Sequence, residues 1–163
     1  VDFCYTMLEK AEVFSDRYKI LLDRTGRVRQ TLVKKDFTVD ARKELRTQTE
    51  FALYNLLHAV HMLKRGEYWS SIKQIETLRR RIGVLMDLSL GKDVAEEYRR
   101  LEFLFPLKVE KKLRKTLCSY GNRAIEKSIA AATQLFCEVG KELAGKLSVE
   151  FPSEKFAHLL KQL

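Results

Sequence analysis

Two short strand-like runs open this chain, and every regular pattern after Gly26 is helical. The run Val1–Tyr5 is rich in residues that favour strands, and Tyr18–Asp23 is an apolar run that ends in turn residues. Two strands are marginally stable alone, so they do not make a complete α/β domain. We therefore expect residues 1–36 to be the C-terminal remnant of a larger α/β domain and residues 37–163 to form a separate helical domain.

Apolar residues recur at intervals of three and four through the rest of the chain, which is the spacing of one helix face. Thr38 is expected to cap the first helix, with Asp40 in its first turn, and Ser153 is expected to cap the last helix. Trp69 is placed on the inward face of the second helix. The pattern predicts helices over 38–63, 67–88, 94–105, 107–119, 122–147 and 153–162. The fold class is mostly α, a bundle of five or six helices preceded by a two-stranded remnant.

The charge of the chain favours anionic partners. Its 31 Lys and Arg residues against 22 Asp and Glu residues give a net charge of +9. The basic groups at Arg79–Arg81 and Lys108–Lys115 spread over several helix faces, and no aromatic residues interleave with them as in single-strand binders. A solvated basic surface is therefore favoured over a phosphate-binding groove, and nucleic acid is not an expected partner.

The cysteines and histidines give little support for a disulfide framework or a metal site. The three cysteines are far apart and lack the Cys-x-x-Cys spacing, which fits a reducing cytosol, so a cytoplasmic protein is expected. His58 and His61 have a spacing that can hold a metal, but no third ligand stands out, so packing or surface roles are favoured. The apolar runs are too short to span a bilayer, and no membrane partner is expected.

Several segments resemble a known family. Val1-Asp2-Phe3 resembles the third acidic strand of the DNA-polymerase-β-type nucleotidyltransferases, and Tyr18–Gly26 resembles the last strand and turn of their catalytic domain. Four further segments resemble the helical domain of the aminoglycoside adenylyltransferase-like members of that family: Glu50-Phe51, Leu63–Trp69, Arg100–Pro106 and Leu135–Pro152. The resemblance covers nearly the whole chain.

The resemblance implies transfer of a nucleotidyl group from a nucleoside triphosphate to a hydroxyl, with two Mg²⁺ ions held by three carboxylates. Two of these carboxylates come from a Gly-Ser loop and an Asp-x-Asp strand, and neither motif occurs in this sequence. Asp2 matches the third carboxylate and is the candidate metal ligand if the upstream domain is present. The alternative is a solvated residue near a frayed terminus.

The same motifs set the cofactor expectations. The full-length protein is expected to use Mg²⁺ and a nucleoside triphosphate, with ATP favoured. This chain alone is expected to bind no cofactor and to be inactive.

The resemblance also implies the candidate site residues. Glu50 is the candidate catalytic residue, because an acid near this position faces the acceptor and can bind an amine or take the proton of the attacking hydroxyl. Glu67, Trp69 and Tyr54 are the candidate substrate-binding residues. Two alternatives stay open: Glu50 can pair with Arg46 four residues earlier, and Trp69 can be a core residue.

The predicted function is that of the C-terminal substrate-binding part of a nucleotidyltransferase that modifies a small, aminoglycoside-like acceptor. The expected partners are a nucleotide, a small hydroxyl or amine acceptor, and a second copy of the chain in a homodimer. The alternative is a non-catalytic helical interaction module, either of the toxin–antitoxin type or a nucleic-acid-binding bundle. Helical nucleases of the toxin type place a His four to six residues after an Arg, and no Arg in this chain has that spacing.

Overall fold

A computed structural model describes residues 12–13, 20, 22–27, 33–34, 39–91 and 107–163 of the chain. The chain divides into two compact units, Val1–Thr38 and Val39–Leu163. Each unit is described by itself below.

The first unit contains a minimal parallel strand pair. Strands β1 (Glu12–Val13) and β2 (Val33–Lys34) lie in register, with Glu12 opposite Val33. The predicted strand Val1–Tyr5 lies outside the described residues. The strand predicted over 18–23 is not shown, because its described residues belong to no strand, and Leu22 is 72% exposed.

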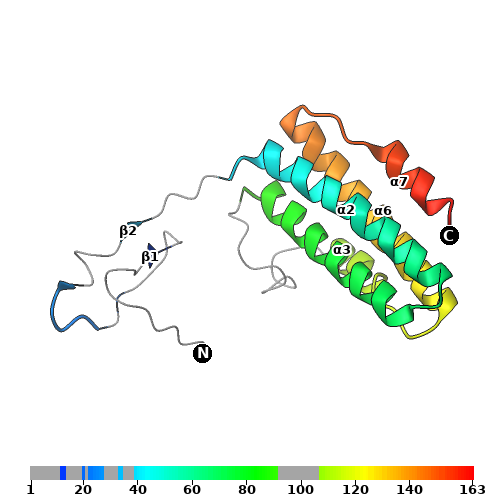
Figure 1. Ribbon diagram of the computed structural model, residues 1–163. Helices are drawn as coiled ribbons and strands as arrows, with labels where there is room; N and C mark the ends of the chain where they lie inside the picture. Colours follow the sequence, from blue (N-terminus) through cyan, green and yellow to red (C-terminus); the bar gives the residue numbers. More distant parts are fainter. Residues whose placement is uncertain (1–11, 14–19, 21, 28–32, 35–38, 92–106) are drawn as a thin grey trace. The chain divides into compact units, whose positions relative to one another are not determined.

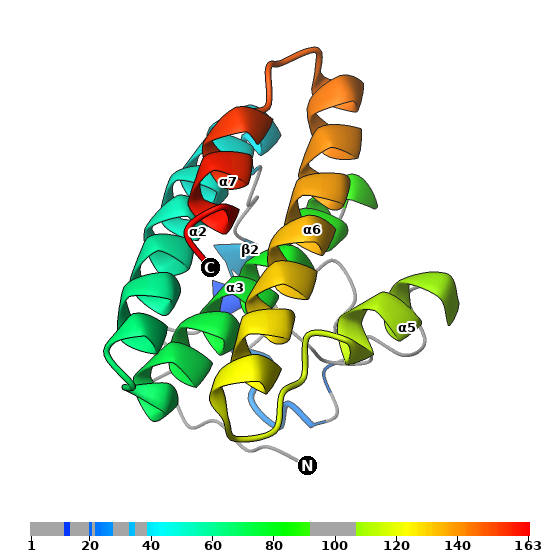
Figure 2. The same cartoon turned by 90° about the vertical axis from the view of Figure 1, so that its right-hand side faces the viewer.

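The second unit has five helices among its described residues, which confirms a mostly helical fold. They are α2 (Ala41–Lys64), α3 (Tyr68–Ser89), α5 (Leu107–Arg114), α6 (Asn122–Leu147) and α7 (Ser153–Leu160). In Figure 1, α2, α3 and α6 lie side by side as long rods, and Figure 2 shows α7 running along α2. The helix predicted over 94–105 lies outside the described residues.

The helix ends differ from the predicted caps at two places. Asp40, not Thr38, caps α2, because its carboxylate accepts hydrogen bonds from the backbone N–H groups of Arg42 at 3.0 Å and Lys43 at 3.1 Å. Ser153 is the first residue of α7 rather than its cap, and its hydroxyl makes no capping bond. Gly66 ends α2 as expected, with a φ of +74° that a side chain would disfavour.

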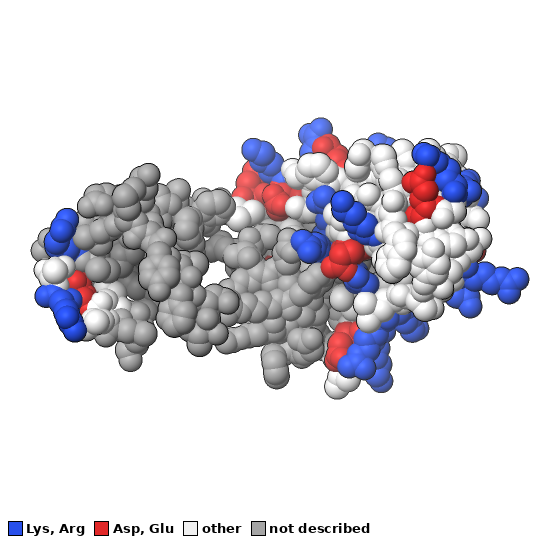
Figure 3. Space-filling model, turned by 60° about the horizontal axis from the view of Figure 1, so that its bottom comes forward, with Lys and Arg blue, Asp and Glu red and all other residues white. Residues whose placement is uncertain are grey.

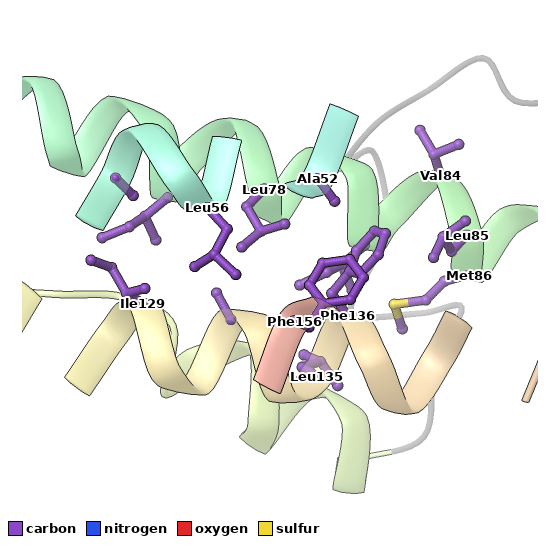
Figure 4. Packing of buried hydrophobic residues seen from close by; sticks show 14 of the residues in the cluster. Ala52, Leu56, Leu78, Val84, Leu85, Met86, Ile129, Leu135, Phe136 and Phe156 are labelled. Atoms are coloured by element: carbon purple, nitrogen blue, oxygen red, sulfur yellow. The ribbon is translucent and has the colours of Figure 1, made fainter. Parts of the chain in front are cut away.

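The core lies between α2, α3 and α6, and α7 closes one side of it (Figure 4). Leu56 of α2, Leu78 of α3 and Phe136 of α6 are almost wholly buried. Phe156 places the aromatic ring of α7 against Phe136, with 5.5 Å between the ring centroids. The apolar spacing of three and four therefore predicted the packed faces of the long helices, except at Trp69.

A polar network crosses the interface of α2 and α3. The guanidinium group of Arg81 donates to Oδ1 of Asn55 and to Oε1 of Gln48, both at 2.8 Å, and Asn55 in turn donates to Gln74 at 2.8 Å. The guanidinium carbon also lies 4.6 Å from the ring centre of Phe51. Burial lowers the pKa of Arg81, and the nearby carboxylate of Glu44 acts in the opposite direction. Arg81 is therefore a structural contact between helices, not part of a solvated basic face.

Candidate functional site

Two adjoining hollows follow the line between α2 and α7, and together we call them the α2–α7 groove. The first hollow has a volume of about 600 Å³ and extends from the first turns of α2 to the segment before α7. The second has a volume of about 500 Å³. Leu53 and Lys155 line both hollows, so the two lie next to each other along the helices.

Glu50 lines the first hollow, and its carboxylate pairs with Nε of Arg46 at 3.0 Å. The ion pair that the i, i+4 spacing predicts is therefore present. Both side chains are exposed, 65% for Glu50 and 82% for Arg46, and such surface pairs contribute about 0–1 kcal/mol. A ligand in the groove can thus compete for the Glu50 carboxylate at little cost, while its catalytic role stays a prediction.

Positive charge is in excess around the first hollow. Arg42, Lys43 and Lys155 line it without an ion-pair partner among the described residues, and Glu150 is the carboxylate there besides Glu50. Arg42 and Lys43 lie in the first turn of α2, and Lys155 lies on α7 across the groove. Sequence reasoning missed this cluster, because its members come from segments more than 100 residues apart.

The second hollow is mostly apolar. Leu57 and Tyr54 of α2 line it together with Leu159, His158 and Glu154 of α7. The ring of Tyr54 lies against that of His58, with 4.2 Å between their centroids. Tyr54 therefore lies next to Glu50 along the same groove, one helical turn further on.

The other two predicted substrate-binding residues lie at the opposite end of α2. Glu67 pairs with Arg65 at 2.7 Å in the turn before α3. Glu50 and Lys64 are separated by 14 helical residues, or roughly 21 Å at 1.5 Å per residue. The structure thus brings Glu50 and Tyr54 together and leaves Glu67 and Trp69 apart from them, while Asp2 lies outside the described residues.

The inward placement of Trp69 is wrong. Its side chain is 74% exposed and contacts Tyr120, with 5.3 Å between the ring centroids. Tyr68 meets the same Tyr120 ring edge-on. Ser71 takes the buried position instead, and its hydroxyl donates to the carbonyl of Ala59 at 2.9 Å, so a small residue lets α2 and α3 approach. The helical period alone does not predict whether Trp69 or Ser71 faces inward in the first turn of α3.

The basic segment 79–81 does not form a phosphate-binding surface. Arg79 is mostly buried, pairs with Glu76 and donates to the carbonyl of Thr116, while Arg81 joins the network described above. On the face shown in Figure 3, the other Lys and Arg side chains are scattered and interspersed with Asp and Glu. This arrangement is typical of a solvated surface.

The described part of the chain holds no group of three or more His, Cys, Asp and Glu residues placed to bind a metal ion. The magnesium prediction depends on Asp2 and stays untested. In the same part of the chain, no helix has the length and apolar character needed to cross a membrane.

Comparisons with known proteins agree at the level of the fold. No protein-family model matches the chain, and no curated protein matches it in sequence. The crystal structure of an aminoglycoside 6-adenyltransferase from Bacillus subtilis is similar to it, with a TM-score of 0.64 and 16% sequence identity over 78% of this chain. The chain spans 55% of that protein's chain. The likeness shows that the two chains share a fold over this part.

Proposed function

We propose that the helical unit Val39–Leu163 is the acceptor-binding part of a nucleotidyltransferase that transfers a nucleoside monophosphate to the hydroxyl of a small compound. The observation that carries this proposal is the likeness of fold to the adenyltransferase over 78% of the chain. The α2–α7 groove supplies a depression of suitable size, since small-molecule sites measure about 300–1,000 Å³. Glu50 lines that groove with an exposed carboxylate.

In this proposal Glu50 accepts the proton of the attacking hydroxyl. A general base has to reach the proton it removes, and an exposed carboxylate held only by Arg46 can turn toward a bound ligand. Arg46 then stays beside the carboxylate. Asp2 is proposed as one ligand of Mg²⁺, which supplies charge stabilisation at the transferred phosphate when it is bound.

The test is nucleotidyl transfer by the natural gene product that contains this chain, measured with a nucleoside triphosphate labelled at the α-phosphate and a panel of hydroxyl acceptors. Glu50→Gln is expected to lower kcat by roughly 100-fold or more, which is the usual contribution of a general base. The melting temperature is expected to stay unchanged, because the Arg46–Glu50 pair is exposed.

Glu142→Gln is the matched control. Glu142 pairs with Lys146 at 2.9 Å, also over one helical turn, and both side chains are exposed on α6 away from the groove. This variant is expected to keep full transfer. Equal activity of the Glu50→Gln variant and the natural protein would remove Glu50 from the chemistry, and absence of transfer to every hydroxyl acceptor would remove the proposal itself.

A further inference from the structure

We infer that the α2–α7 groove takes an anionic acceptor, a hydroxyl compound that carries a phosphate or carboxylate group beside an apolar or aromatic body, and not a polyamine. The inference rests on the proposed function, since it names the substrate class of the same groove. It also separates this chain from the aminoglycoside named for the similar structure, because aminoglycosides carry several amines.

The charges of the first hollow carry the inference. Arg46 and Glu50 neutralise each other, which leaves Arg42, Lys43 and Lys155 against the single carboxylate of Glu150. None of these three cations has an ion-pair partner among the residues that the structure describes. An ammonium group entering the hollow would meet uncompensated positive charge, whereas a phosphate or carboxylate would find donors there.

The placement of these cations suits an anion held from two sides. Arg42 and Lys43 belong to α2 and Lys155 to α7, so a small anion in the hollow can be contacted from both walls. A guanidinium group also matches the paired oxygens of a phosphate or carboxylate better than a point charge does. The carboxylate of Asp40 is held by the backbone N–H groups at the start of α2 and does not line the hollow.

The second hollow determines the rest of the ligand. Leu53, Leu57 and Leu159 line it, with the exposed ring of Tyr54 beside them. Its remaining lining residues are Glu154, Lys155 and His158 of α7. Because this apolar region lies next to the charged one, a ligand that fills both has an anionic end and an apolar or aromatic end.

The first test is a binding titration of the 163-residue chain followed by amide NMR shifts, with phenyl phosphate, inorganic phosphate and kanamycin as probes. Phenyl phosphate is expected to shift residues of both hollows, inorganic phosphate only those of the first, and kanamycin neither. The double variant Lys43→Gln/Lys155→Gln is expected to weaken phenyl phosphate binding at least tenfold. Lys127→Gln is the control, because Lys127 is exposed on α6 outside the groove.

A charge reversal makes the test sharper. Lys43→Glu/Lys155→Glu is expected to reverse the preference, so that kanamycin binds and phenyl phosphate does not. Tighter binding of kanamycin than of phenyl phosphate by the natural chain would overturn the inference, and so would an absence of binding by all three probes.

The two proposals fail separately. A gene product that transfers a nucleotide to a polyamine in a Glu50-dependent way keeps the proposed function and overturns the anionic acceptor. A chain that binds phenyl phosphate in the groove, within a gene product that transfers nothing, keeps the charge preference and overturns the proposed function.

Discussion

At the scale of single residues, Gly140 of α6 is a position where an added side chain would meet a neighbouring ring. A Cβ atom added there would lie 2.7 Å from Cζ of Phe151 and closer still to its Cε2 atom. The ring of Phe151 stacks on that of Phe156, with 5.7 Å between centroids, and so cannot withdraw freely. The absent side chain at Gly140 is thus what lets the segment before α7 lie against α6.

Gly140→Ala is expected to lower the free energy of unfolding by about 1–3 kcal/mol, which is the usual cost of overpacking. Gly145→Ala is the matched control in the same helix, since nothing lies within 4 Å of its added Cβ, and it is expected to raise stability by about 0.5–1 kcal/mol. Urea unfolding of the two variants measures both effects. If both substitutions raised the free energy of unfolding, Phe151 would not pack on Gly140.

The thiol of Cys137 is expected to react slowly. Burial raises its pKa to about 11, although nearby Lys141 acts in the opposite direction. Only about one thiol in a thousand is then ionised at pH 8, and the thiolate is the reactive form. Alkylation of Cys137, followed by mass spectrometry with Cys137→Ser as the control, should be at least about 100-fold slower than that of a free cysteine. It should accelerate roughly tenfold per pH unit.

The same pKa shift has a consequence for stability. Between pH 9.0 and about 11, the unfolded thiol releases its proton while the folded thiol keeps it. The free energy of unfolding should therefore fall as the pH rises through this range. A stability that rises over the same range, after correction with the Cys137→Ser variant, would contradict the assigned burial effect.

At the scale of elements, α2 depends on one side chain for its start. Asp40→Ala removes the two hydrogen bonds to the N–H groups of Arg42 and Lys43 and is expected to cost about 0.5–2 kcal/mol. Asp40→Asn keeps an acceptor and is expected to lose little. Thermal melting of the two variants, with the secondary-structure content checked by circular dichroism, distinguishes them. Equal losses would point to the charge of Asp40 rather than its hydrogen bonds.

The sequence predicted the long helices well because their apolar spacing extends over several turns. It failed where one or two residues decide the outcome. Thr38 and Asp40 are both residue types that cap helices well, and the sequence alone does not tell which of them accepts hydrogen bonds from the first N–H groups of the helix. Trp69 follows the first residue of α3, and its ring contacts that of Tyr120, a residue of the segment before α6. Local periodicity does not contain this information.

The candidate site was predictable only in part. Glu50 and Tyr54 lie on the groove because the spacing of four placed both on one face of α2. The groove itself depends on α7, whose Phe156 anchors it to Phe136 across about 20 residues of chain. Lys155 reaches the groove only through this docking. No pairwise spacing along the sequence indicates that Lys155 lies across from Arg42.

At the scale of the whole molecule, the described apolar core lies within the second unit. The buried apolar residues that the structure describes run from Leu45 to Phe156 and thus all belong to the second unit. The first unit has two strands of two residues each in its described part, and such a pair is marginal alone. The helical unit should therefore carry its own stability.

We accordingly expect residues 39–163, expressed by themselves, to fold and to unfold cooperatively at nearly the melting temperature of the complete chain. Phe156→Ala in both chains provides the control. Removing this buried ring should lower the free energy of unfolding by about 3–5 kcal/mol. The loss should be the same in both chains, because the partners Phe136 and Phe151 lie within the shorter chain. Calorimetry of the four proteins measures this. A shorter chain that stays unfolded while the complete chain melts cooperatively would contradict the independent stability of the helical unit.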